Sequence, residues 1–185
     1  MAFAEPTEPS MPAMIDSFLP DYDFRTSHRQ WVDADTDEVW AALTTVRFDE
    51  LVLTRPLLRV RKLGKRIPPG SVFYDGPVTL LRVEDGRQAV GGSIAQSWSL
   101  RPRHKELSTA EEFLSFTDPG WVKFVTDFRV QPDKGGTRLS TETRIKATDS
   151  VSKRRFFLYW TGIRMFSGVV RRDVLAAVAR KATAR

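Results

Sequence analysis

The last third of the chain most constrains the fold, because two alternating strands lead into one long amphipathic helix. Residues 121–131 and 137–147 alternate polar and apolar side chains, the pattern of half-buried antiparallel strands. Asp149 and Ser150 then predict the start of a helix over residues 151–182. An antiparallel sheet and a single helix bury both apolar faces only if the helix lies across the sheet. The sequence therefore predicts a sheet gripped by its C-terminal helix.

The two faces of these elements predict one shared interior. Apolar and threonine side chains of the strands fall on one face, while charged side chains fall on the other. The helix has an apolar stripe at i, i+3, i+4 spacing, and its arginines, Arg171 among them, lie mainly off that stripe. Charged residues assigned to the outward face of the strands include Lys123, Asp127, Arg129, Glu142 and Arg144.

The first half of the chain predicts short elements. Residues 22–32 alternate as a strand that places His28 on the inner face. Asp35 and Glu38 have the spacing of a capping box, which predicts a short helix containing Trp40. Pro56 suits the first turn of a second short helix over residues 57–63.

More strands are expected in the middle of the chain. Asp85 and Gly86 predict a tight hairpin between strands over residues 78–83 and 87–95. Residues 97–108 are expected to be a strand end or a loop, and residues 110–117 a further strand.

Composition excludes several classes of protein. The 185 residues include no cysteine and only two histidines, so neither a thiolate site nor a zinc site is expected, and no metal or cofactor is predicted. No apolar run reaches the roughly 20 residues that span a bilayer, and the N-terminus lacks a signal pattern, so a cytoplasmic location is expected. The proline-containing residues 1–14 predict a disordered leader, followed by one domain over residues 15–185.

Several segments resemble a known superfamily. They are the first strand leading into residues 37–43, the turn at 118–120, the run 137–144, and the helix core at 159–164 with Ser167 and Gly168. Over nearly all of residues 20–183 the chain resembles the SRPBCC superfamily (START/polyketide-cyclase/Bet v 1-like), and within it a bacterial branch. The resemblance implies an α+β helix-grip fold. In that fold a curved antiparallel sheet of about six or seven strands wraps a long C-terminal helix, with two short helices after the first strand.

That resemblance also implies a cavity between sheet and helix. The residues expected to line it are His28, Trp40, Phe124, Thr126, Phe128, Thr141, Thr143, Trp160, Ile163 and Arg164. An inward Arg164 needs a ligand carboxylate or phosphate, or a protein carboxylate such as Glu112, because a buried unpaired charge is costly. Alternatively, Arg164 forms an ion pair inside the protein, or its charged group reaches solvent. An inward His28 could serve as a general base or as a structural hydrogen-bonding residue.

We expect a non-catalytic protein that binds or transports a small, mostly apolar molecule such as a lipid or polyketide. The first alternative is a cyclase or hydrolase-type enzyme acting in the same cavity. The second is a basic surface module, because the net charge is +6 and residues 55–66 combine leucines with arginines and lysines. That segment could contact an anionic membrane, or pack as a helix with a solvated basic face. No signature of specific nucleic-acid binding is found, and the sequence leaves the oligomeric state open.

Overall fold

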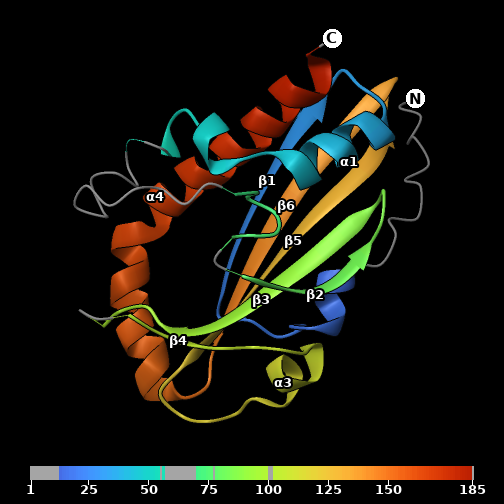
Figure 1. Cartoon of the computed structure of the whole chain (residues 1–185). Coiled ribbons are helices and arrows are strands. Elements are labelled where there is room, and N and C mark those ends of the chain that lie inside the picture. The colour runs from blue at the N-terminus through green and yellow to red at the C-terminus, as the bar shows by residue number, and fades with distance from the viewer. Residues whose placement is uncertain (1–12, 55, 57–69, 77, 100–101, 185) are drawn as a thin grey trace, which may run out of the picture.

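A curved antiparallel sheet with a long helix across its concave side forms the structure, a computed structural model that describes residues 13–54, 56, 70–76, 78–99 and 102–184 (Figure 1). Five strands follow the order β1-β6-β5-β3-β2, and the short β4 pairs with β3. The strands are β1 (Phe24–Val32), β2 (Thr79–Glu84), β3 (Gln88–Gln96), β4 (Arg103–Lys105), β5 (Val122–Asp133) and β6 (Gly136–Ala147).

The helical elements lie on both sides of this sheet. They are η1 (Met14–Ser17), α1 (Thr36–Thr45), η2 (Phe48–Glu50), α3 (Ala110–Ser115) and α4 (Ser150–Thr183). The predicted class is confirmed: an α+β fold whose curved sheet holds a long C-terminal helix, with short helices after the first strand. The predicted helix over residues 57–63 lies outside the described residues, as do residues 1–12 of the predicted leader.

Side-chain caps fix the helices that hold the sheet. The capping box predicted at α1 is present, since Asp35 accepts a bond from the Glu38 backbone N–H and Glu38 accepts one from Asp35. At α4, Asp149 caps the helix through the Ser152 N–H and also accepts the Gly120 N–H at 2.6 Å. The second bond ties the turn before β5 to the start of α4.

Two apolar clusters lie at opposite ends of the concave face. One joins the C-terminal part of α4 to α1 and to the ends of β1, β5 and β6; it includes Val32, Val39, Leu139, Val174 and Val178. The other surrounds the buried Phe156 near the start of α4 and includes Val122 and Ile145. Asp173 fixes the first end, because its carboxylate accepts backbone N–H bonds from residues 52–54 at 2.7–3.3 Å.

The convex face is covered over β3 and β5, so several of the charged residues that were predicted to face outward are shielded from solvent. Apolar side chains of η1, of the residues after it and of α3 pack on β3 and β5, forming a third cluster. As a result Asp127, Glu142 and Arg144 are only 0%, 3% and 8% exposed. They pair with one another and with neighbouring arginines: Arg129 reaches Asp127 at 3.0 Å, and Arg144 reaches Glu142 at 2.7 Å.

The strand predicted over residues 110–117 is wrong, because this segment begins with the helix α3. The Thr109 side chain accepts the Glu112 N–H and so supplies an N-cap. Ala110, Glu111 and Glu112 favour helix over strand. Phe113 alone among the six residues is fully buried, so a single anchor against the sheet suffices.

Candidate functional site

The concave face changes character from row to row along the sheet. Residues paired across β1, β6 and β5 share a face, and the first row, Phe24, Ile145 and Phe124, is apolar. The next row contains three hydroxyls, from Thr26, Thr143 and Thr126. The third row is His28, Thr141 and Phe128, and the fourth combines Gln30 with the apolar Leu139 and Val130.

Arg171 of α4 contacts the row of hydroxyls on the sheet. Its Nη2 donates to Thr126 Oγ1 at 3.4 Å, and Thr126 shares a 2.9 Å hydrogen bond with Thr143. We name Thr26, His28, Thr126, Thr141, Thr143 and Arg171 the concave polar cluster. It lies between the two apolar ends of the concave face.

Three atoms of the concave polar cluster are buried without a hydrogen-bond partner in the described part of the chain. They are Thr26 Oγ1, His28 Nε2 and Arg171 Nε. Most buried polar groups in proteins are hydrogen-bonded, so several unpaired atoms in one place need an explanation.

The middle of α4 packs loosely over this cluster. Phe156 and Asp173 are buried, but every residue of α4 between them is half-buried or exposed. A Cβ placed on Gly168 would stand 3.7 Å from His28 Nε2, whereas one on Gly162 would meet nothing within 4 Å. Gly168 therefore faces the cluster and Gly162 faces open space.

Burial and positive charge set the protonation of the cluster. Burial lowers the pKa of His28, and the charges of Arg172 and Arg171 lower it further, which favours the neutral imidazole at pH 7. Burial also lowers the pKa of Arg171 to about 10, although the more distant carboxylate of Asp127 acts in the opposite direction. The cluster is thus a weakly compensated positive site.

The structure separates the predicted cavity residues into groups. Phe124 and Trp160 pack around Phe156 at the aromatic end, with ring centroids 5.6 and 5.8 Å from it. Trp40 and Phe128 pack against the cluster at the opposite end, where Trp40 lies 5.9 Å from Phe73. The remaining strand residues, His28, Thr126, Thr141 and Thr143, stand between these ends, and Ile163 is half-buried on α4.

Arg164 does not face the interior, which corrects the expectation of an inward charge there. Its side chain is exposed on α4. Glu112, its suggested partner, accepts the Ser108 N–H within the loop before α3.

The residue that reaches the interior is Arg171, which sequence reasoning placed off the apolar stripe. The sequence held a sign of this inward direction, because Arg171 lies one turn after Ser167 and one turn before Val174, which both belong to the stripe. Thr26 and Gly168 were also missing from the predicted site. Thr26 alternates with His28 on the inner face of the first strand, and Gly168 was among the residues that carry the family resemblance, but neither was predicted to belong to the site.

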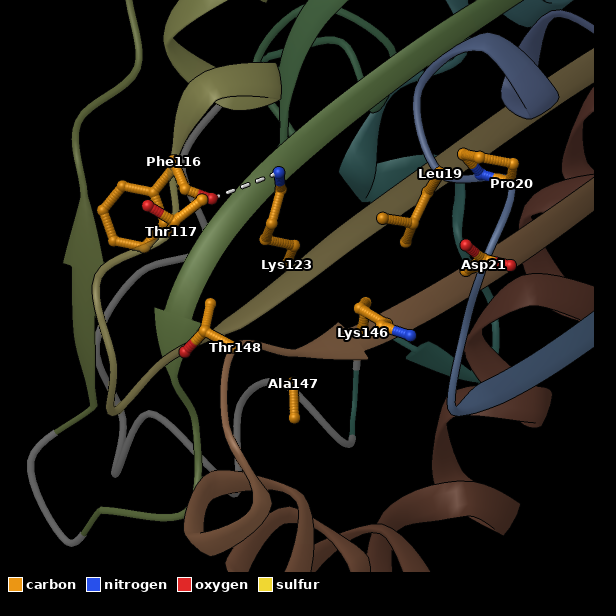
Figure 2. A pocket seen from close by; sticks show the side chains of 9 residues that line it. All are labelled: Leu19, Pro20, Asp21, Phe116, Thr117, Lys123, Lys146, Ala147 and Thr148. Atoms are coloured by element: carbon orange, nitrogen blue, oxygen red, sulfur yellow. Dashed lines mark hydrogen bonds between the residues drawn. The ribbon is translucent and has the colours of Figure 1, made fainter.

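The segment after η1, the loop after α3, and β5 and β6 form a cavity of about 280 Å³. Figure 2 shows the residues that line it. Lys123 lines this cavity, and burial lowers the pKa of this lysine. Its Nζ already donates to the carbonyls of Leu114 and Phe116 at 3.2 and 3.4 Å. Pockets for small ligands usually have about 300–1,000 Å³. This cavity is small and its lysine is occupied, so it is the weaker candidate.

Two other hollows have the size of ligand pockets. One of about 640 Å³ lies between β1 and α4 and is lined by Phe24, Phe157 and Leu158 with charged neighbours. It borders the Phe24 ring that packs on Phe156, so it adjoins the aromatic end of the concave face. The other, about 670 Å³, lies at the sheet edge near β2 and β4, with Ser93 and His104 in its lining.

Among the described residues, no His, Asp and Glu side chains gather into a group that could hold a metal ion. In the same part of the chain, no helix is both long enough and apolar enough to cross a membrane.

Comparisons with known proteins show remote likeness in structure. No family model matches the chain, and no curated protein matches it. Protein MLL2253 from Mesorhizobium loti is 16% identical, with 85% of this chain and 98% of that chain covered, at a TM-score of 0.40. CalU16 from Micromonospora echinospora is 16% identical over 86% and 84% of the two chains, at a TM-score of 0.32. Protein Ms6760 from Mycobacterium smegmatis is 12% identical over 89% and 96%, at a TM-score of 0.43. At these values the likeness carries no argument about function, which is therefore argued from the site.

Proposed function

We propose that the protein binds a small, mostly apolar molecule between the concave face of the sheet and the middle of α4. The observation that carries this proposal is the set of three buried unpaired atoms of Thr26, His28 and Arg171. Each buried polar atom left unpaired costs about 1–3 kcal/mol. The polar end of a bound molecule would supply the missing bonds.

The surroundings of the cluster support an apolar body for that molecule. The rings of Phe24, Phe124 and Trp160 gather around Phe156 beside the hydroxyl row. Ligand sites typically combine apolar and aromatic walls with a few placed polar groups. The order of elements also supports the proposal that the chain is a divergent member of the SRPBCC superfamily.

A pair of glycine variants tests the location of the site. Gly168→Leu extends a side chain toward His28, whereas Gly162→Leu makes the same change where a Cβ meets nothing within 4 Å. The protein and both variants are purified from the native host and examined by native mass spectrometry. We expect a small molecule on the wild type and Gly162→Leu that is lost from Gly168→Leu. An unliganded wild type, or equal retention by both variants, would contradict the proposal.

An enzyme of the cyclase or hydrolase type is the second candidate, and His28 is the observation that favours it. A neutral imidazole with an unpaired, inward Nε2 has the form required of a general base. Hydrolysis of apolar p-nitrophenyl esters would test it. A rate that falls at least tenfold in His28→Asn supports catalysis, and equal rates with and without His28 exclude it for these substrates.

Contact with an anionic membrane through residues 55–66 stays a prediction. Of this segment only Pro56 lies within the described residues. Co-sedimentation with anionic and neutral liposomes tests it, and equal binding to both would contradict it.

A further inference from the structure

Unlike Arg25, Arg129 and Arg144 of the sheet, Arg171 has no carboxylate partner among the described residues. On the convex face, Arg25, Arg129 and Arg144 each lie 2.7–3.0 Å from the carboxylate of Asp127 or Glu142. On the concave side, the one hydrogen-bond acceptor of the Arg171 side chain among the described residues is the Thr126 hydroxyl, at 3.4 Å.

The acid that acts electrostatically on Arg171 is already engaged on the opposite face. Asp127 Oδ1 accepts the Glu142 N–H at 2.7 Å, and Oδ2 lies 3.0 Å from Arg129 Nε. Asp127 is therefore held away from the concave side. Of the five N–H donors of a guanidinium, Nε–H of Arg171 is buried and unused.

Arg172 adds to the positive charge around Arg171, while the neutral imidazole of His28 adds a polar group. The charges of both arginines act on the His28 imidazole, whose Nε2 is also buried and unpaired. A negatively charged group at this point would gain charge-assisted hydrogen bonds, which are about twice as strong as neutral ones. It would also remove the cost of a poorly compensated buried charge.

We infer that Arg171, together with His28 and Thr126, binds an oxyanion, a carboxylate or phosphate, at one end of an otherwise apolar ligand. The inference rests on the function proposed above and narrows the ligand class to acidic amphiphiles. The acidic group lies at the concave polar cluster, and the apolar body extends toward Phe156 and Trp160 at the aromatic end.

Matched arginine variants and matched probes test this assignment. Dodecanoate, dodecyl phosphate and 1-dodecanol share one apolar chain and differ only in the head group. Binding of each is measured by isothermal titration calorimetry to the wild type, Arg171→Gln and Arg164→Gln. Arg164 lies two turns earlier on α4 and is exposed, so it controls for loss of one positive charge from the same helix.

The wild type should bind the tighter of the two acidic probes at least tenfold more strongly than the alcohol, as expected for hydrogen bonds to charged groups. Whichever acid binds more tightly identifies the carboxylate or the phosphate as the preferred head group. Arg171→Gln should lose the preference for acids and keep its affinity for 1-dodecanol within about threefold, whereas Arg164→Gln should retain the preference. Without ligand, Arg171→Gln should melt at or above the wild-type temperature, because a half-buried charge without a carboxylate partner has been removed.

Two kinds of outcome would overturn the inference. If the wild type binds 1-dodecanol as tightly as both acids, or if the two variants lose acid binding equally, Arg171 does not recognise an oxyanion, although the apolar site stands. If the wild type binds none of the three probes, the proposed function fails and the inference fails with it.

Discussion

Replacing Asp127 by asparagine tests how burial controls the charge network on the convex face. The carboxylate is 0% exposed and pairs with Arg129 at 3.0 Å. Burial nevertheless raises the pKa of Asp127 from 3.8 to about 6, because the attraction of Arg129 only partly offsets the loss of water. A pKa change of this size corresponds to a free-energy difference of roughly 3 kcal/mol.

The sign of the pH dependence follows from the raised pKa. Between about pH 4 and pH 6 the folded protein keeps a proton on Asp127 that the unfolded chain has lost. Raising the pH through this window should therefore lower the free energy of unfolding by up to roughly 3 kcal/mol through this group alone. Asp127→Asn is neutral at every pH, so the variant should gain stability relative to wild type as the pH rises. Urea denaturation at half-unit pH intervals measures the difference.

Asp23 supplies a control of opposite sign. Although burial acts to raise its pKa, the bond to Lys153 at 2.6 Å and the Ala147 N–H hold the pKa of Asp23 below its usual value. Asp23→Asn should thus be less stable than wild type at neutral pH, and the two should converge as the pH falls below about 4. Parallel stability curves for wild type and Asp127→Asn would refute the reasoning about burial.

Four further substitutions have expected effects on the free energy of unfolding, each measured by urea denaturation. Phe156→Ala should cost about 3–5 kcal/mol because the ring is fully buried among aromatic side chains, whereas Phe157→Ala, at a position 56% exposed, should cost less than about 1 kcal/mol. Asp173→Ala should cost at least about 3 kcal/mol, since three backbone N–H groups of residues 52–54 lose their shared acceptor; a cost below about 1 kcal/mol would contradict this role. Gly162→Ala should stabilise by up to about 1 kcal/mol, because a Cβ there meets nothing within 4 Å; destabilisation would reveal packing on that face.

Sequence alone predicted the elements whose signal is local and repeated. β5 and β6 alternate over more than ten residues each, and the caps at Asp35 and Asp149 mark the helix starts, so these elements were found within one or two residues. α3 was missed because six residues give too short a pattern to separate helix from strand. The sequence prediction took no account of the Thr109 N-cap that the structure shows.

Burial of the charged convex face could not be read from alternation, because alternation gives the face of a strand but not what covers that face. Asp127, Glu142 and Arg144 have the polar pattern of a solvated surface. Their burial depends on η1 and Leu19, far away in sequence; Leu19 places its carbonyl 3.0 Å from Arg144 Nη1.

The choice between Arg164 and Arg171 shows why the concave site also escaped the sequence. The two residues lie two turns apart on α4, so helical periodicity gives them nearly the same direction at the edge of the apolar stripe. They differ in how far the surrounding part of α4 is buried. Near Val174 α4 is packed into an apolar cluster, and Arg171, one turn earlier, reaches Thr126. Further toward the N-terminus the helix is only half-covered, so Arg164 remains in solvent. Arg164 is therefore exposed to water, whereas Arg171 is half-buried and has no carboxylate partner among the described residues. An acidic ligand would therefore gain more binding free energy at Arg171 than at Arg164.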